Sequence, residues 1–255
     1  MRAQDVFSLD GRVALVTGAG SGLGRRFAEV LAANGGRVIV SDIDGASAKE
    51  TAAAILSQGG QATSVAIDVT SASSIAAGLR TGELAFGRVD VLVNNAGVLS
   101  KGRAITLPES EWRRVFDVNL DGAWRVAQQV AASMIEGEGG VIVNIASVLG
   151  VATGKGVLPY TVAKAGLVQL TRALALEWAP AGIRVNALAP GYVATQLNRD
   201  FTLAKAGEGL RRRIPQRRFG KESDLDGALL LLASSASAFM TGSIVIVDGG
   251  QMLTA

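Results

Sequence analysis

Short runs of aliphatic and β-branched residues recur along the whole chain, and all but the last precede a longer stretch with helical spacing of its apolar residues. Strands that are apolar on both faces are typical of a parallel sheet covered by helices on both sides. The alternation of strand and helix predicts right-handed βαβ units, and therefore an α/β fold with a doubly wound, mostly parallel sheet. The expected strands are residues 13–17, 38–41, 63–67, 89–93, 141–145, 184–188 and 244–247.

The chain shows no sign of a boundary between domains. It has 255 residues, and neither an internal repeat nor a linker rich in Pro or Ser divides it, so we predict one domain over residues 1–255. The segment at about residues 192–218 is long and polar and has no expected strand, which is typical of a lid or binding loop. The expected helices lie at about residues 22–33, 46–58, 71–85, 109–135, 160–178 and 222–233.

A glycine-rich turn joins the first expected strand to the first helix, in the sequence VALVTGAGSGLGRRFAEVLA. Gly18, Gly22 and Gly24 would let the backbone turn tightly and approach a pyrophosphate, which the free N–H groups at the helix start attract. A tight βα turn without any ligand is the alternative that this motif alone leaves open. A dinucleotide site therefore needs a second, independent feature.

Asp42 supplies that feature, because it ends the second expected strand. A carboxylate there can accept hydrogen bonds from both adenosine ribose hydroxyls and would repel a 2′-phosphate, although alone it would often be only a solvated side chain. Arg25, Arg26 and Arg37 could favour NADP, but they lie inside the first helix and at the start of the second strand. We interpret these arginines as mostly solvated or snorkelling side chains, so NAD is the expected cofactor and NADP the less favoured one.

The chain contains no histidine and no cysteine, so acid–base chemistry near neutral pH needs another proton carrier. Tyr160 and Lys164 lie four positions apart in LPYTVAKAG and would share one face of a helix. A nearby ammonium is expected to stabilise the phenolate and lower the pKa of the phenol. Ser147 follows the fifth strand, where its hydroxyl could stabilise charge on a substrate carbonyl oxygen.

Taken together, the motifs resemble the short-chain dehydrogenase/reductase family over essentially the whole chain. Ala146 and Pro159 depart from the pattern of many members, and they affect the outline of the pocket rather than a required functional group. The resemblance implies a Rossmann fold with a helical substrate lid. The matching stretches are TGAGSGLG at 17–24, DV at 68–69, NNAG at 94–97, VNLDG at 118–122, Ser147, YTVAK at 160–164, PG at 190–191 and DGG at 248–250.

The resemblance also implies roles for individual residues. Asn119 would steady a water that links Lys164 to solvent, and the catalytic set would be Asn119, Ser147, Tyr160 and Lys164. Asp68 would lie beside the adenine ring, and the segment after Pro190 beside the nicotinamide carboxamide. The residues expected to bind the cofactor are Gly18, Ser21, Gly22, Leu23, Gly24, Asp42, Ile43, Asp68, Val69, Asn95, Tyr160, Lys164, Pro190, Val193 and Thr195.

The implied function is an oxidoreductase that transfers a hydride between NAD(H) and a secondary alcohol or its ketone, with Tyr160 as acid and base. A catalytically idle dinucleotide-binding sensor or scaffold is the alternative. The substrate stays open among 3-oxoacyl thioesters, sugars or sugar acids, and cyclic or aliphatic alcohols. The family's usual tetramer agrees with a composition that is 49% hydrophobic and 18% charged, so we expect a homotetramer.

Several classes of function are not expected from the composition. Without cysteine or histidine we predict no disulfide and no transition-metal site. The net charge of +3 is too small to favour a nucleic-acid partner, although five arginines lie between Arg211 and Arg218 beside Phe219. We interpret this run mainly as a solvated helix face, with the steering of anionic substrates as the alternative. Without an apolar segment long enough for a membrane or a signal peptide, we expect a cytoplasmic protein.

Overall fold

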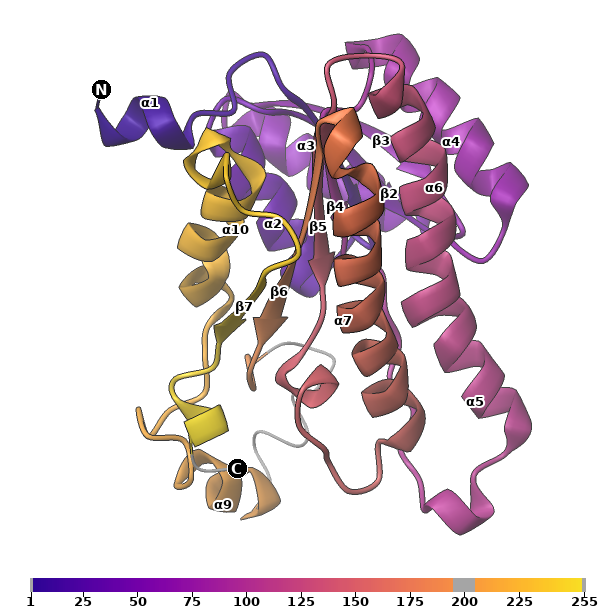
Figure 1. The fold of residues 1–255 in the computed structure, drawn as a ribbon, viewed down its shortest axis with the longest axis vertical. Helices are drawn as coiled ribbons and strands as arrows, with labels where there is room; N and C mark the ends of the chain where they lie inside the picture. Colours follow the sequence, from indigo (N-terminus) through magenta and orange to yellow (C-terminus); the bar gives the residue numbers. More distant parts are fainter. Residues whose placement is uncertain (1, 195–204, 254–255) are drawn as a thin grey trace.

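The computed structural model describes residues 2–194 and 205–253, with the backbone alone at 205 and 206. Within these residues a 7-stranded sheet has the order β3-β2-β1-β4-β5-β6-β7, and all neighbouring strands are parallel. The doubly wound α/β fold predicted from the sequence is therefore confirmed (Figure 1). The strands are β1 (Val13–Thr17), β2 (Arg37–Asp42), β3 (Gln61–Ala66), β4 (Val91–Asn94), β5 (Gly140–Ile145), β6 (Ile183–Pro190) and β7 (Ile244–Val247).

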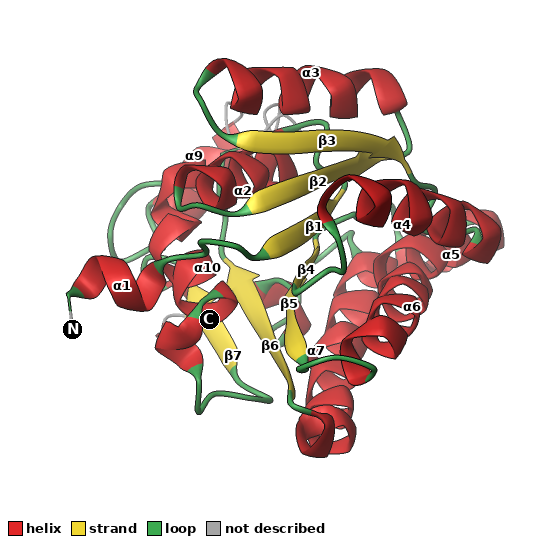
Figure 2. Ribbon diagram, turned by 90° about the horizontal axis from the view of Figure 1, so that it is seen from above, coloured by secondary structure: helices red, strands yellow, loops and turns green. Residues whose placement is uncertain are grey.

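Helices cover both faces of the sheet (Figure 2). One face packs against α2 (Gly22–Ala33), α3 (Gly45–Ser57) and α10 (Asp226–Ala233). The other face packs against α4 (Ala72–Phe86), α6 (Ala123–Ile135) and α7 (Leu158–Trp178). Alternate residues of each central strand enter the two cores, which explains why these strands are apolar at nearly every position. Shorter helices are α1 (Ala3–Phe7), α5 (Glu109–Phe116) and α9 (Lys205–Arg211).

The order of the strands determines where a ligand can bind. The chain runs from β1 outward through β2 to β3, and then crosses back to β4 on the other side of β1. The loops after β1 and β4 therefore diverge, and they leave a crevice at the carboxyl ends of the strands. Within the described part of the chain, no helix is both long enough and apolar enough to cross a lipid bilayer.

One local feature differs from the sequence-based expectations. The helix predicted at 109–135 consists of α5 and α6 joined by a π-helical turn, Asp117–Gly122. A π turn adds one residue without changing the residue types around it, so apolar spacing does not reveal it. In the segment at 192–218, the described residues include α9, and Val193 forms a bridge with Gly220 just beyond the segment.

Candidate active site

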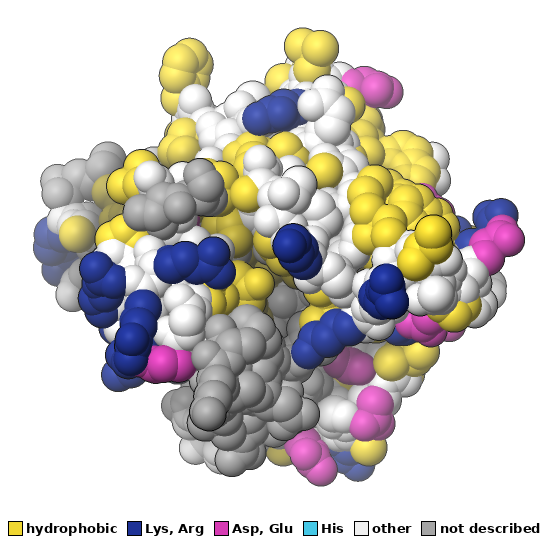
Figure 3. All heavy atoms as spheres, turned by 90° about the horizontal axis from the view of Figure 1, so that it is seen from below, with side chains coloured by type: hydrophobic (Ala, Val, Ile, Leu, Met, Phe, Trp, Pro, Cys, Tyr) yellow, Lys and Arg dark blue, Asp and Glu magenta, His cyan; other side chains and the backbone are white. Residues whose placement is uncertain are grey.

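A cavity of about 1070 Å³ opens at the carboxyl ends of the strands, on the face seen in Figure 3. Most of the predicted site residues meet in it, although they come from distant parts of the chain. Asn119 lies outside its lining, and Thr195 lies outside the described residues. The predicted residues that line the cavity are Gly18, Ser21, Gly22, Leu23, Gly24, Asp42, Ile43, Asp68, Val69, Asn95, Ser147, Tyr160, Lys164, Pro190 and Val193.

The glycines of the turn are needed for two reasons, backbone conformation and close contacts. Gly18 and Gly22 have φ angles of +63° and +52°, which side chains rarely adopt. A Cβ on Gly24 would lie 2.1 Å from the carbonyl oxygen of Gly18 and 2.4 Å from the Asn95 side-chain nitrogen. Asn95 Nδ2 donates to the carbonyl oxygens of Thr17 (2.9 Å) and Gly18 (3.0 Å) and so ties the turn to the end of β4. The turn and the start of α2 fit a pyrophosphate, because glycines without side chains let such a group approach the backbone N–H groups.

Asp42 stands at the end of β2 with both carboxylate oxygens facing backbone amides. Gly20 N–H donates to its Oδ2 at 2.9 Å, and Asp44 N–H donates to its Oδ1 at 3.1 Å. Each oxygen keeps a further lone pair for a hydroxyl group. The cations that line the cavity come from the chain after β4, on the other side of β1. Asp42 and its surroundings therefore fit an unmodified ribose better than a 2′-phosphate.

The three arginines weighed for NADP do not line the cavity, and each has a partner elsewhere in the protein. Arg25 forms an ion pair of 3.1 Å with the acid one helical turn further on. Arg26 forms an ion pair with Asp226 of α10, which joins two helices on the same face of the sheet. Arg37 Nη2 donates to the carbonyl oxygen of Gly11 at 2.8 Å. Each guanidinium thus has a structural partner in the protein.

Helix α7 carries Tyr160 and Lys164 into the cavity, and Pro159 lies in its first turn, where the missing N–H is tolerated. Lys164 Nζ lies 5.7 Å from the centre of the Tyr160 ring and donates to the carbonyl oxygen of Ile145 at 2.6 Å. The lysine is only 4% exposed. Burial disfavours its charge and lowers the pKa of Lys164 to about 8.

The Tyr160 phenol differs from the sequence-based expectation. Its burial raises its pKa above the ordinary value, and a hydrogen bond with the Ser147 side chain offsets only part of that rise. We expected the neighbouring ammonium to lower this pKa, and that prediction was wrong for the protein alone. The physical reason is that burial removes water from the phenolate, and this desolvation, together with the charge of the nearby Tyr192 phenolate, outweighs the opposing effect of Ser147.

Asn119 lies in the π turn, 1% exposed, behind the wall of the cavity. Its Oδ1 accepts from Val98 N–H at 2.7 Å, and its Nδ2 donates to the Val98 carbonyl oxygen at 2.9 Å. A Cβ on Gly97 would lie 3.5 Å from Asn119 Oδ1 and 3.8 Å from Lys164 Nζ, so both groups flank Gly97. The amide thus holds the loop after β4, and its link to Lys164 through a water stays a prediction.

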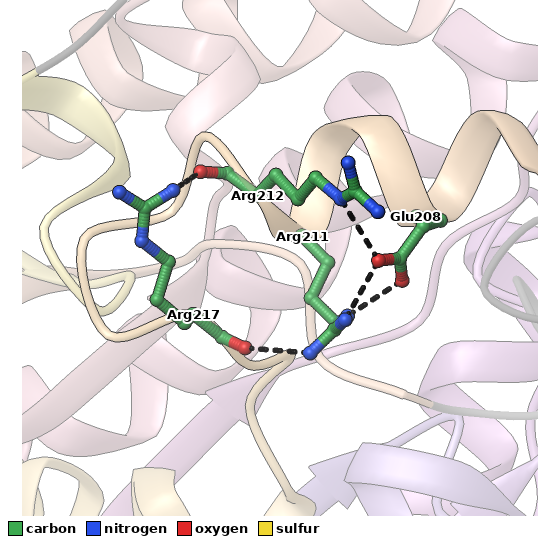
Figure 4. Close-up of polar contacts among 4 residues, drawn as sticks. All are labelled: Glu208, Arg211, Arg212 and Arg217. Carbon is green, nitrogen blue, oxygen red and sulfur yellow. Dashed lines mark hydrogen bonds and ion pairs between the residues drawn. The ribbon is translucent and has the colours of Figure 1, made fainter.

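The arginine run is held by nearby acids and backbone carbonyls (Figure 4). Arg211 Nη2 and Arg212 Nε contact Glu208 at 2.7 and 3.1 Å, and these contacts lower the pKa of the Glu208 carboxyl to about 2. Arg218 forms an ion pair with Asp224, and Arg217 donates to the carbonyl oxygen of Arg212. No arginine between residues 211 and 218 lines the cavity, which favours the interpretation as a solvated face.

Sequence reasoning missed part of the cavity wall. Lys101 and Arg103 follow β4, Lys155 precedes α7, and Tyr192 follows β6. Burial raises the pKa of the Tyr192 phenol. The only signal in the sequence was that these residues follow strands, and many other residues share that signal. Their grouping depends on which loops meet in space.

Comparison with known proteins identifies the family. A family model described as enoyl-(acyl carrier protein) reductase matches residues 18–252. The chain is 39% identical over 253 residues to a 2-dehydro-3-deoxy-D-gluconate 5-dehydrogenase of Dickeya dadantii, covering 97% of this chain and 98% of that protein. It is 34% identical over 247 residues to an NAD-dependent glycerol dehydrogenase of Listeria innocua, covering 97% and 96%.

A solved structure agrees with both sequence matches. The gluconate 5-dehydrogenase of Burkholderia cenocepacia, in complex with NADP and tartrate, superposes with a TM-score of 0.96 at 36% identity and covers 100% of both chains. The match extends over the whole length of the chain. The chain therefore belongs to the short-chain dehydrogenase/reductase family and is an oxidoreductase that acts on CH–OH groups.

Proposed function

We propose that this protein oxidises a secondary alcohol, or reduces the matching ketone, with NAD(H) as its partner and Tyr160 as the acid–base. The observation that carries the proposal is that Ser147, Tyr160 and Lys164 line the same cavity as the glycine turn. We take residues 1–255 as one functional domain, with residues 192–218 as its lid. A bound nicotinamide would supply the hydride acceptor or donor.

Residues of the chain then stabilise charge on the substrate oxygen and transfer its proton. Ser147 donates a hydrogen bond to the substrate oxygen and stabilises the negative charge on it during the reaction. In oxidation the Tyr160 phenolate takes the hydroxyl proton, and in reduction the phenol returns it. Lys164, buried beside the ring and held by Ile145, provides the positive field and a route for the proton. The apolar wall excludes water from the reacting atoms.

The remaining site residues would hold the dinucleotide. The glycine turn and Ser21 would bind the pyrophosphate, Asp42 the adenosine ribose, and Asp68 with Val69 the adenine. Asn95, Pro190, Val193 and Thr195 would border the nicotinamide half. The relatives leave the choice between NAD and NADP open, since one is named NAD-dependent and another holds NADP. The position of Asp42 favours NAD.

The choice of cofactor is tested at Asp42. Asp42→Ala should weaken NAD binding by about 1–3 kcal/mol and relax discrimination against NADP, because it removes two ribose hydrogen bonds and the repulsion of a 2′-phosphate. Asp42→Asn is the matched control, since it keeps an acceptor for the Gly20 amide and removes only the charge. Fluorescence titration with NADH and NADPH measures the affinity for each cofactor and so the discrimination between them. A parent protein that prefers NADPH would refute this role of Asp42.

The alternative of an idle sensor or scaffold gains no support from the relatives named above, which are dehydrogenases. The test is to mix the protein with NAD and a panel of secondary alcohols and follow the absorbance of the reduced nicotinamide. Tight NAD binding without turnover on any member of a broad panel, in either direction, would favour the binding-only alternative.

We also propose a homotetramer. The edge strand β7 leaves Ile246 42% exposed, and Phe239 and Leu253 are 106% and 87% exposed in the single chain. Apolar side chains on an open strand edge are suited to burial in a subunit contact. Sedimentation at micromolar concentrations should show a tetramer, and Phe239→Ser should shift it toward smaller species. A parent protein that sediments as a monomer throughout this range would contradict the proposal.

A further inference from the structure

Three cationic side chains outside the predicted site line the catalytic end of the cavity. Lys101 and Arg103 belong to the loop after β4, and Lys155 belongs to the loop between β5 and α7. All three residues are exposed, and Figure 3 shows Lys and Arg side chains on this face of the molecule. These three cations belong neither to the glycine turn nor to the acid–base residues, so the proposed function gives them no role.

A backbone hydrogen bond brings the two loops together. Gly102 N–H donates to the carbonyl oxygen of Gly156 at 2.9 Å. Gly156 adopts a φ of +75°, which a residue with a side chain rarely adopts. Since Lys101 and Arg103 flank Gly102, and Lys155 precedes Gly156, this bond places all three cations along one rim of the cavity.

The charges that line the cavity are separated along its length. The acids Asp42 and Asp68 follow β2 and β3, whereas the three cations belong to loops that follow β4 and β5, on the other side of β1. Asp42 and Asp68 both accept hydrogen bonds from neighbouring backbone amides. The cavity therefore has an acidic end beside the glycine turn and a cationic end beside Ser147 and Tyr160.

No ion pair within the described residues neutralises this cationic rim. The first acids after Arg103 along the chain are Glu109 and Glu111, and they pair with Arg113 at 2.7 Å and with Arg114 at 2.9 Å. Cations without an acidic partner, beside an apolar cavity, attract an anion and can hold it by charge-assisted hydrogen bonds. The planar fork of Arg103 suits the two oxygens of a carboxylate or phosphate.

We propose that Lys101, Arg103 and Lys155 form a subsite for the terminal anionic group of a hydroxylated substrate. The substrate class is then a sugar acid or sugar phosphate rather than a neutral alcohol. The subsite would hold the anion at the rim while the carbon to be oxidised lies at Ser147 and Tyr160. This inference rests on the proposed function for its reaction, but the binding of the anion can be measured without turnover.

The experiment compares gluconate, glucitol and glucitol 6-phosphate, which share a chain of hydroxylated carbons and differ in the terminal group. Calorimetry in the presence of NADH measures their binding, and initial rates measure KM and kcat. We expect the parent to bind at least one anion more tightly than glucitol. The tighter of the two anions identifies the group as a carboxylate or a phosphate.

Removal of the charges should affect the anions alone. Lys101→Met, Arg103→Met and Lys155→Met should each weaken anion binding about 3- to 10-fold, and together about 30-fold or more, with glucitol and NADH unchanged within about twofold. Arg103→Lys should restore part of the loss, because it restores the charge without the fork. Lys49→Met, at an exposed lysine of α3 outside the cavity, is the matched control.

The outcomes separate the inference from the proposed function. Equal losses for anions and glucitol, weaker NADH binding in the variants, or no preference of the parent for an anion would each overturn the subsite. If the parent binds an anion selectively through these cations but oxidises no alcohol, the proposed function fails and the subsite stands.

Discussion

Replacement of Tyr160 with phenylalanine is expected to lower turnover by about 10²- to 10⁴-fold while NAD still binds with nearly parental affinity. The ring of Tyr160 fills its place beside Lys164, and the change removes only the hydroxyl group. The chain has no histidine that could take over the proton, and the Lys164 ammonium is held by the carbonyl oxygen of Ile145. Steady-state kinetics and an NADH titration measure the two effects separately.

The pH dependence gives an independent check of this assignment. Burial raises the pKa of Tyr160 above its ordinary value of 10.0, so the phenol form predominates at neutral pH. Oxidation needs the phenolate, so its rate should increase as the pH rises toward the raised pKa of Tyr160. Reduction needs the phenol, so its rate should fall only above that raised pKa. The residual activity of the phenylalanine variant should lack both trends. Near-parental turnover in that variant would refute the acid–base role.

Replacement of Ser147 with alanine is expected to lower kcat by about 10²- to 10³-fold, the usual effect of losing one donor to a developing oxyanion. The serine also affects Tyr160, because their hydrogen bond lowers the phenol pKa. The alkaline rise of the oxidation rate should therefore move to higher pH in the alanine variant. Ser147→Thr keeps a hydroxyl and should recover part of the rate.

A structural contribution of Ser147 must be separated from the catalytic one. Its hydroxyl oxygen accepts from Leu149 N–H at 3.1 Å and caps the short turn Val148–Gly150. Loss of such a cap costs about 1 kcal/mol of unfolding free energy. Ser71→Ala is the matched control, because Ser71 caps α4 away from the cavity. A similar drop in kcat for both alanine variants would show that Ser147 acts only through stability.

Much of the fold could be predicted from the sequence because its signals are local or periodic. Strands buried on both faces must be apolar at successive positions, and so the runs at β1, β2 and β5 stand out. The glycines of the first turn are required by positive φ angles and by close backbone contacts, which leave no freedom in residue type. Tyr160 and Lys164 are one helical turn apart, a spacing that sequence alone reveals.

Other properties depend on which parts of the chain meet in space. The direction of the Tyr160 pKa shift depends on burial, and the four-residue spacing between Tyr160 and Lys164 gives no information about burial. The acids that pair with the arginine run are not marked by any pattern in the sequence. Asn119 lies in a π turn that apolar spacing does not reveal, and it bonds the backbone of Val98, which is distant in sequence.

The sequence by itself determined the sheet, the glycine turn and the spacing of Tyr160 and Lys164 on one helix, because each rests on the residue types within a short stretch of chain. Only the tertiary structure decided the charge of the cavity rim. Lys101 and Lys155 are far apart in sequence, and their loops meet through one backbone hydrogen bond between Gly102 and Gly156. Backbone amides and carbonyls are the same at every such residue, so nothing in the residue types predicts which two will pair.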